Sequence, residues 1–392
     1  MNPAGPTPPP AHPEQTPRRH YLDHASTSPL RPEAVAAMTA WLDAPLADPG
    51  RIYAEGMAAR HALEEARVDV AELFGARPRE VVLTSGATEA IAAACFGAAE
   101  RGTHQVVAAI EHSAVRRNAE ANGEVSVVGV DGHGRVDVDE LLAAVRPETA
   151  LVHLQWANHE VGTTQPVAEA VAGCRERGVL VHVDAAQAGG RVPIAFDDLG
   201  ADLCSVSGHK LGGPPGTGAL LVRRGLRVRP LLVGGDQERA RRAGLENLPA
   251  VAGFGAACAA LAADGGARLA TEAQRARRHT DRIAAFVTDG PVGGLRLHGD
   301  AVGRLPHLVC IAVDDVEPQA VVLGLDRMGV AVHSGSSCAS EGIEPSPVLA
   351  AMGVDAERSL RVSVGWSSTD ADVDALLGAL GPVLAGLRAL RR

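Results

Sequence analysis

The sequence predicts an α/β protein with a mainly parallel sheet and a smaller second domain. Short apolar runs alternate with helix-like segments from residue 81 to about residue 207, which is typical of a parallel sheet covered by helices on both faces. A chain of 392 residues exceeds what one hydrophobic core usually organises. Near Leu248 the alternation gives way to Ala- and Arg-rich helical segments, which indicate the second domain.

The expected elements follow in order along the chain. We expect a disordered proline-rich tail at 1–19, a large domain at 20–250 and a small domain at 251–392. About the first 12 residues of the large domain are expected to pack with the small one. Helices are expected at 32–42, 57–74, 88–100, 113–121, 137–145 and 166–177, with strands at 81–84, 105–110, 125–130, 150–155, 179–183 and 201–207. Two long helices should follow residue 248.

Composition narrows the possible functions. The net charge of −10 does not favour binding to nucleic acid or to an anionic membrane. The N-terminus lacks the charged start and apolar core of a signal peptide, and no apolar run reaches membrane-spanning length, so we expect a cytoplasmic protein. The cysteines form no CxxC or His/Cys cluster, so no metal site is expected. Five of them lie in apolar runs and should be buried: Cys95, Cys174, Cys204, Cys258 and Cys310.

Lys210 is the only lysine, although lysine and arginine together number 37. Arginine cannot replace lysine where a neutral amine must attack a carbonyl group. Asp184 ends one expected strand, and Lys210 follows the next strand along the chain. Because ligands of such sheets bind at the carboxyl ends of the strands, the pair suits pyridoxal phosphate, whose aldehyde would join the lysine as an imine while the aspartate pairs with the ring nitrogen. A structural Asp–Lys ion pair is the alternative reading.

Other residues at strand ends fit the same interpretation. The sequence T84-S-G-A-T-E89 lies between a strand and a helix and can hold a phosphate, although helix capping explains its Ser and Thr about as well. Ser207 and His209 add donors for that phosphate. Gln187 is placed to donate to a ring hydroxyl, and His112 follows a strand and is placed to stack on a ring.

Cys338 differs from the other cysteines because its loop, H333-S-G-S-S-C-A-S-E-G342, is polar and glycine-containing. Such a loop is expected to be exposed. An exposed thiol can react as a thiolate, whereas a cysteine buried in an apolar core is inert.

Taken together, the motifs resemble a cysteine desulfurase of the NifS/IscS type, a class V aminotransferase relative. The matching segments run from Tyr21 to about Gly365 and include T-S-G-A-T-E, E-H-S-A-V, H-V-D-A-A-Q, S-G-H-K, S-G-S-S-C and S-L-R-V-S. The resemblance implies the fold type I architecture of pyridoxal-phosphate enzymes. In that architecture a large domain holds a mainly parallel seven-stranded sheet, and a smaller α/β domain lies at the C-terminus and carries the catalytic cysteine loop.

The resemblance also implies roles for individual residues. Lys210, Cys338 and His112 would be catalytic, with Lys210 carrying the cofactor imine and Cys338 taking the sulfur. Arg361 would bind the substrate carboxylate. The cofactor pyridoxal 5′-phosphate would be held by Ala87, Thr88, His112, His159, Asp184, Gln187, Ser207, His209 and Lys210. The implied partners are L-cysteine, a second copy of the chain in a homodimer, and a protein that accepts the sulfur.

Three positions depart from the family pattern. His159 stands where an asparagine usually lies near the ring hydroxyl, and Leu245 stands where a threonine reaches the phosphate of the partner subunit. The early N-P-S-S-x-H motif reads D48-P-G-R-I-Y53 and has lost its histidine. Arg241 and Arg242, just before Leu245, are expected to supply the missing phosphate contact.

Two alternatives to a desulfurase remain open from the sequence. One is another pyridoxal reaction, such as transamination, β-elimination or selenocysteine cleavage. The other is a non-catalytic scaffold. Cys338 argues against transamination and β-elimination, and a scaffold would need neither the lysine nor the cysteine. The sulfur acceptor, whether for iron–sulfur assembly, tRNA thiolation or natural-product sulfuration, is not specified by the sequence.

Overall fold

The computed structural model describes residues 19–44, 47–335 and 345–390. Its seven-stranded sheet lies in the half of the molecule built from residues before 250, in the strand order β2-β8-β7-β6-β5-β3-β4. The strands are β2 (Val81–Thr84), β3 (His104–Ala108), β4 (Glu124–Val128), β5 (Thr149–Gln155), β6 (Leu180–Asp184), β7 (Leu203–Ser207) and β8 (Gly218–Val222). This confirms the predicted α/β class with a mainly parallel sheet.

Strand β8 is the antiparallel member of this sheet. It pairs with β2 in the register Val82↔Leu220 and with β7 in the register Ser205↔Leu220. Because β8 runs against both neighbours, β2 and β7 point the same way, as do the parallel strands β3 to β7. The carboxyl ends of six strands therefore meet at one edge of the sheet.

Apolar side chains alternate between the two faces of the sheet, and each face is covered. In β2, Val81 and Leu83 join the main core, whereas Val82 packs with Leu220 and helix α3 on the opposite face. This alternation follows from the two-residue period of a strand. The helices of this half are α1 (Pro32–Leu42), α2 (Ala54–Leu73), α3 (Ala87–Ala98), α4 (Ser113–Asn122), α5 (Val138–Ala143), α6 (Val167–Glu176), α7 (Phe196–Leu199) and α8 (Gln237–Ala240).

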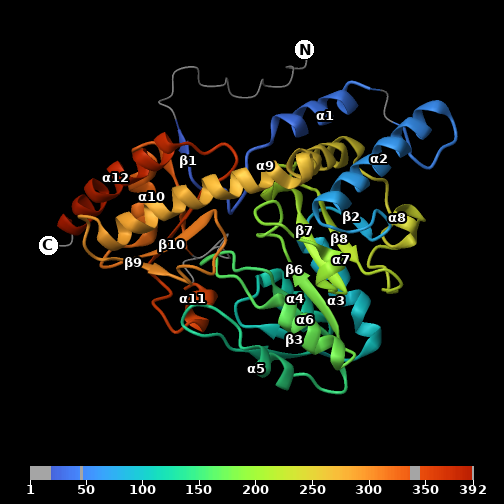
Figure 1. Cartoon of the computed structure of the whole chain (residues 1–392), viewed down its shortest axis with the longest axis horizontal. Helices are drawn as coiled ribbons and strands as arrows, with labels where there is room; N and C mark the ends of the chain where they lie inside the picture. The colour runs from blue at the N-terminus through green and yellow to red at the C-terminus, as the bar shows by residue number, and fades with distance from the viewer. Residues whose placement is uncertain (1–18, 45–46, 336–344, 391–392) are drawn as a thin grey trace, which may run out of the picture.

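Helix α9 (Leu248–Asp289) connects the two halves of the molecule (Figure 1). It packs on α1 and α2, and also on strands of the second half. Two helices were predicted here, and the 42-residue α9 consists of two helical parts, because residues 263–266 between them leave helical geometry, with Gly265 and Gly266 at positive φ. One window of α9 is apolar enough to cross a membrane, but 61% of it is buried inside the fold, as expected for a core helix.

The second half has its own sheet and hydrophobic core. Its four-stranded antiparallel sheet has the order β12-β13-β10-β9, and strand β1 pairs in parallel with β11 beside it. The elements are β1 (His20–Tyr21), β9 (Leu295–His298), β10 (Leu308–Val313), α10 (Pro318–Arg327), β11 (Val330–Ala331), β12 (His333–Ser334), α11 (Pro347–Ala351), β13 (Ser359–Ser363) and α12 (Asp370–Ala389). The N-terminal strand β1 thus joins the C-terminal half of the chain.

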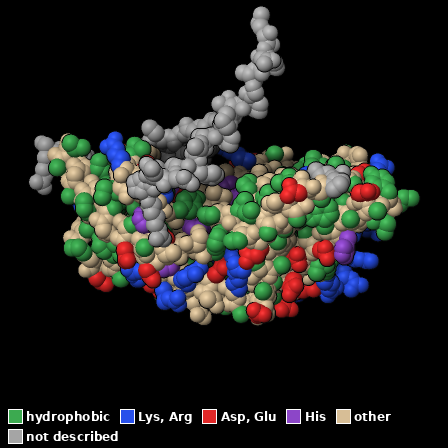
Figure 2. Space-filling view, turned by 90° about the horizontal axis from the view of Figure 1, so that it is seen from above, with side chains coloured by type: hydrophobic (Ala, Val, Ile, Leu, Met, Phe, Trp, Pro, Cys, Tyr) green, Lys and Arg blue, Asp and Glu red, His purple; other side chains and the backbone are tan. Residues whose placement is uncertain are grey.

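Charged side chains of both signs lie on the face of the molecule seen in Figure 2. Figure 2 shows acidic and basic side chains interspersed on the visible face, without one continuous patch of either sign. The five cysteines predicted to be buried are all buried and free.

Candidate active site

A cavity of about 450 Å³ opens at the carboxyl edge of the large sheet. It brings together every predicted site residue that the structure describes. These lining residues are Ala87, Thr88, His112, His159, Asp184, Gln187, Ser207, His209, Lys210 and Arg361. Cys338 lies outside the described residues. The size of the cavity is typical of a small-molecule site.

Lys210 ends the short 3-10 turn Gly208–Lys210 that follows β7. Its Nζ atom donates a hydrogen bond to the carbonyl of Ala25. Burial lowers the pKa of this amine to about 7, and the positive charge of Arg361 acts in the same direction. A large fraction of the amine is therefore neutral near pH 7, as a nucleophilic lysine requires.

Asp184 is the last residue of β6 and lies one strand away from β7. Its Oδ1 atom accepts the backbone N–H of Ala186 at 2.9 Å and lies 3.4 Å from the hydroxyl of Ser205. Among the described residues, no hydrogen bond to its Oδ2 atom is formed. Burial raises the pKa of the carboxyl group. Oδ2 is thus available to a cationic N–H donor in the cavity, which would stabilise the ionised form.

His112 and His159 form a pair of neutral rings. The ring centroids are 5.2 Å apart and the rings meet edge to face. The Nδ1 atom of His112 accepts the N–H of Ala114 at 3.1 Å, which leaves its proton on Nε2 when the ring is neutral. Burial lowers the pKa of both rings. Neither nitrogen of His159 has a hydrogen-bond partner among the described residues, so this buried ring can still bond a polar ligand.

The turn between β2 and α3 provides a cradle for an anion. Gly86 precedes α3 and offers no side chain to cap it, and a Cβ added to Gly86 would meet no atom within 4 Å. The first N–H groups of a helix lack partners within the helix and attract negative charge. Across this turn, the hydroxyl of Ser207 lies 3.1 Å from Nδ1 of His209. The set fits a phosphate group.

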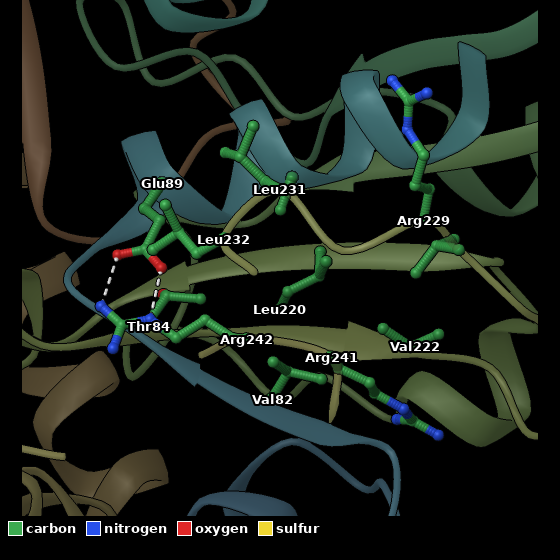
Figure 3. Close-up of a pocket in the computed structure, with 12 residues that line it drawn as sticks. Val82, Thr84, Glu89, Leu220, Val222, Arg229, Leu231, Leu232, Arg241 and Arg242 are labelled. Carbon is green, nitrogen blue, oxygen red and sulfur yellow. Dashed lines mark hydrogen bonds and ion pairs between the residues drawn. The ribbon is translucent and has the colours of Figure 1, made fainter. Parts of the chain in front are cut away.

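Glu89 lies in the first turn of α3 and is neutralised from outside the cavity. Arg242 contacts both of its carboxylate oxygens, at 2.9 Å and 3.3 Å (Figure 3). Hydrogen bonds from Arg242 and from the N–H of Ser85 hold the pKa of Glu89 below its usual value although burial opposes them. The space beside this ion pair measures about 10 Å³, which suits one water rather than a ligand.

Arg241 and Arg242 are engaged within their own chain. Arg242 pairs with Glu89, and Arg241 donates to the carbonyl of Arg79 at 3.0 Å. Leu245 is 63% exposed. The predicted contact between these arginines and a phosphate across a dimer is not tested by a single chain, and it stays a prediction.

Gln187 has most of its hydrogen-bonding capacity in use. Its Nε2 atom donates to the carbonyl of Ala25 at 3.1 Å, and its Oε1 atom lies 3.2 Å from Nε2 of the buried His307. An amide nitrogen carries two protons. One N–H therefore remains for a ligand oxygen in the cavity, which agrees with the predicted contact to a ring hydroxyl.

Arg361 comes from the small sheet, at the centre of β13, and its guanidinium is buried. It donates to Asp23 at 3.1 Å, to the hydroxyl of Ser26 at 2.7 Å and to the carbonyl of His159 at 3.0 Å. These contacts fix a planar cation at the wall of the cavity opposite the large sheet. A fixed guanidinium suits a carboxylate.

Several residues of the cavity were not predicted. Gln155 ends β5 and Ser26 lies beside Arg361; both line the cavity. Glu111 is buried just outside it, accepts the N–H of Gln155 at 2.7 Å, and has a pKa that burial raises to about 8. The strand-end rule that found Asp184 would have found Gln155. No local signal in the sequence marks Ser26.

The residues present fit a phosphorylated aromatic aldehyde. The partly neutral amine of Lys210 suits an aldehyde, the free oxygen of Asp184 suits a protonated ring nitrogen, and the start of α3 suits a phosphate. The ring nitrogens of His159 form no hydrogen bond within the described part of the chain, so they leave a buried polar group that such a ring could satisfy. These requirements meet in one cavity.

Comparisons with known proteins agree on one family. Residues 20–376 match the family model described as aminotransferase class-V. The chain is 40% identical over 385 residues to a cysteine desulfurase from Cereibacter sphaeroides, covering 95% of this chain and 97% of that protein. It is 37% identical to the cysteine desulfurase IscS of Methanosarcina thermophila, covering 94% and 92%.

Solved structures give the same result. A NifS-like protein from Rickettsia africae ESF-5 has a TM-score of 0.85 and 28% identity, with 94% of this chain and 100% of that chain covered. A structure of SspA in complex with cysteine has a TM-score of 0.76 and 26% identity, with 89% and 100% covered.

Proposed function

This chain belongs to the aminotransferase class-V family, and we propose that it is a cysteine desulfurase that uses pyridoxal 5′-phosphate to convert L-cysteine to L-alanine. The observation that carries the proposal is the meeting of Lys210, Asp184 and Arg361 in one cavity of ligand size. Lys210 has an amine poised to lose its proton near neutrality. The names of the similar proteins support the choice of cysteine as substrate.

We assign the cofactor contacts as follows. The Lys210 amine would hold the aldehyde carbon, the Asp184 carboxylate would pair with the ring nitrogen, and His112 would stack on the ring. Gln187 and His159 meet the ring hydroxyl, and the phosphate is held by Ala87, Thr88, Ser207 and His209. When bound, the cofactor supplies an electron-withdrawing ring that makes the Cα–H bond of an attached amino acid acidic.

The chain's own residues would then act in turn. Arg361 binds the carboxylate of cysteine by two hydrogen bonds and orients its Cα–H bond. Lys210, once released from the cofactor, takes the Cα proton and returns a proton to the product, a role that its lowered pKa favours. The neutral His112 lines the same cavity and carries its proton on Nε2, from which it would donate to the reacting substrate.

Sulfur transfer is assigned to Cys338. Its thiolate forms an S–S bond with the substrate sulfur while the substrate C–S bond breaks, and the electron pair of that bond stays with the carbon fragment. The carbon fragment takes up protons and leaves as alanine. L-cysteine and the Cys338 thiol thus become alanine and a Cys338 persulfide, without an external oxidant or reductant.

The assembly and cellular partners also belong to this proposal. We propose a cytoplasmic homodimer that passes the persulfide sulfur to an acceptor protein, as the resemblance to the desulfurase family implies. Gel filtration with light scattering tests the dimer. A pull-down with the persulfidated protein tests the acceptor.

The central test is product analysis. Purified protein loaded with pyridoxal phosphate should convert L-cysteine to alanine and, with a thiol reductant, release one sulfide for each alanine. Pyruvate with ammonia would indicate β-elimination instead, and a keto acid that keeps its sulfur would indicate transamination. If none of these products forms from cysteine or selenocysteine, the proposed function is wrong.

A further inference from the structure

A chain of hydrogen-bonded side chains runs through the interior of the large sheet to Asp184. Gln105 on β3 contacts His153 on β5 at 2.8 Å, and His153 contacts His182 on β6 through their Nδ1 atoms at 3.0 Å. The Nε2 atom of His182 lies 3.1 Å from the hydroxyl of Ser205 on β7, which in turn lies 3.4 Å from Oδ1 of Asp184. All five side chains are buried.

The imidazole rings of His153 and His182 in this hydrogen-bonded series are both neutral. Burial lowers the pKa of His182 to about 3 and that of His153 well below its ordinary value. A neutral imidazole has one N–H donor and one acceptor nitrogen. The hydrogen bonds from Gln105 to Asp184 can therefore all donate in only one of two directions. Each group donates to its neighbour either toward Gln105 or toward Asp184.

Donation toward Gln105 leaves two unfavourable contacts: a lone pair that faces a carboxylate, and a buried amide donor without an acceptor. If the amide oxygen of Gln105 accepts from His153, then His153 accepts from His182, and His182 accepts the hydroxyl proton of Ser205. Ser205 then faces the carboxylate of Asp184 with a lone pair. The Nε2 atom of Gln105 also stays without a partner among the described residues, and an orphaned buried donor is costly.

The opposite direction removes the repulsion and gives the amide nitrogen of Gln105 an acceptor, while the amide oxygen takes the position that has no partner among the described residues. Unpaired buried carbonyl oxygens are less rare in proteins than unpaired buried N–H groups. Exchanging the nitrogen and oxygen of the Gln105 amide moves no heavy-atom position, and such assignments follow from the network around them. The amide then donates to Nε2 of His153, His153 donates to His182, and His182 donates to Ser205. The Ser205 hydroxyl donates to Asp184. The thiol of Cys95, 3.7 Å from the same His153 nitrogen, becomes a second donor to it.

We propose that Gln105, His153, His182 and Ser205 form a directed relay that delivers a hydrogen bond to Oδ1 of Asp184. With the N–H of Ala186, Oδ1 then receives two donors, and Oδ2 is left to face the cavity. The relay positions the carboxylate and keeps it ionised where burial opposes the charge. The inference rests on the proposed function, because it assigns Asp184 to the ring nitrogen of the cofactor.

Other charged groups also act on Asp184. Glu111 interacts with Asp184, and a charged Glu111 would oppose the ionisation of Asp184. The charges of His112 and Lys210 favour the ionised form of Asp184. The relay lies on the face of the sheet that α3 covers, where Cys95 of that helix contacts His153. Its effect can therefore be separated from theirs by changing relay residues alone.

The first experiment reads the proton order directly. Holoenzyme containing ¹⁵N-histidine is examined by NMR, and the two rings are assigned with the variants His153→Asn and His182→Asn. The relay requires the proton of His153 on Nδ1 and the proton of His182 on Nε2. Protons on Nε2 of His153 and Nδ1 of His182, or a charged ring at either position, would overturn the relay.

The second experiment tests the effect on Asp184. Pyridoxal phosphate labelled with ¹⁵N at the ring nitrogen is bound to wild type and to Ser205→Ala at one fixed pH. Losing a hydrogen bond to a charged group should shift the proton from the ring nitrogen toward Asp184 by about tenfold. The resonance then moves toward that of an unprotonated ring, and Ser205→Thr, which keeps the hydroxyl, should restore it.

His104→Asn is the matched control. His104 precedes Gln105 on β3, is equally buried, and bonds Thr149 at 2.8 Å and Ser126 at 3.0 Å on the other side of the strand. Its substitution should leave the ring-nitrogen resonance unchanged. An unchanged resonance in Ser205→Ala, or an equal shift in His104→Asn, would contradict the relay. Wild-type protein that binds no cofactor would instead refute the proposed function.

Discussion

Lys210 and Asp184 stand at the ends of adjacent strands of the large sheet, whereas Arg361 stands in the middle of a strand of the small sheet. The first two face the cavity because the chain turns there, and main-chain groups of Ala25 and Ala186 hold them. Arg361 is held by side chains and a carbonyl from other segments, including Asp23 and His159.

This difference separates two parts of the proposed reaction. The side of the cavity at the ends of the large-sheet strands, which we call the large-sheet wall, includes Lys210 and Asp184. These groups bind and tune the cofactor, so they should decide whether any chemistry occurs. The small-sheet wall holds the cation for the substrate carboxylate, and in sequence the Cys338 loop lies between β12 and α11. Its residues should decide which substrate reacts and where the sulfur goes.

Lys210→Ala should have the largest effect, because it removes both the cofactor anchor and the proton carrier. We expect alanine formation to fall by at least about 10³-fold. Borohydride should fix the cofactor onto the wild-type peptide that contains Lys210 and onto no peptide of the variant. A variant that still converts cysteine would show that the large-sheet wall has been misassigned.

Cys338→Ala should distinguish cofactor binding from sulfur transfer most clearly. The variant should keep its cofactor and change the cofactor's absorbance when cysteine is added, yet lose persulfide and sulfide formation by about 100-fold or more. Cys310→Ala, at a buried cysteine of β10, is the matched control and should retain sulfide release. Normal sulfide release by Cys338→Ala would favour β-elimination.

Arg361→Lys should change substrate binding more than cofactor binding. Lysine keeps the charge but loses the planar two-point contact with a carboxylate. We expect the KM for cysteine to rise roughly ten- to a hundredfold while the affinity for pyridoxal phosphate stays within about threefold of wild type. An equal loss of cofactor affinity would mean that the two walls do not act separately.

The pH dependence of cofactor loading tests the electrostatics of the large-sheet wall. Only the neutral amine of Lys210 attacks an aldehyde, and its pKa is about 7. The loading rate of apo protein should therefore rise about tenfold from pH 6 to pH 8 and then level off. Stopped-flow absorbance measures it. A rate that keeps rising beyond pH 9 would indicate a lysine of ordinary pKa.

Arg242→Ala should have the smallest effect. It leaves the carboxylate of Glu89 uncompensated at the start of α3, where that charge would repel the cofactor phosphate. We expect cofactor affinity to fall several-fold. Arg241→Ala, which loses a bond to the Arg79 carbonyl and leaves the Arg242–Glu89 pair intact, is the comparison variant. Restored affinity in Arg242→Ala combined with Glu89→Gln would support this explanation, and equal losses in both arginine variants would contradict it.

Local sequence patterns predicted most of the large sheet. The expected strand at 81–84 coincides with β2, and the apolar run ending in Asp184 coincides with β6 within one residue. Because strand ends follow from periodicity, the positions of Asp184 and Lys210 followed as well. The orientation of β8 depends on its partners β2 and β7, which no local pattern encodes.

Side-chain contacts between segments far apart in the sequence could not be predicted from local sequence patterns. The break in α9 at residues 263–266 has a local cause in Gly265 and Gly266, and it agrees with the two helices predicted after residue 248. The bond between Gln187 and His307 spans 120 residues, and that between Arg361 and Asp23 spans 338. Such pairings arise only when segments from both halves of the chain come together.

The pairing of β1 with β11 has a consequence for synthesis of the chain. Residues 19 and 326 are bonded although they lie 307 positions apart, and the N–H of His20 bonds the carbonyl of Gly329. A ribosome adds about 5–20 residues per second, so roughly 15–60 s separate the emergence of the two partners. Strand β1 cannot form its pairing with β11 during that interval, in which all seven strands of the large sheet are synthesised.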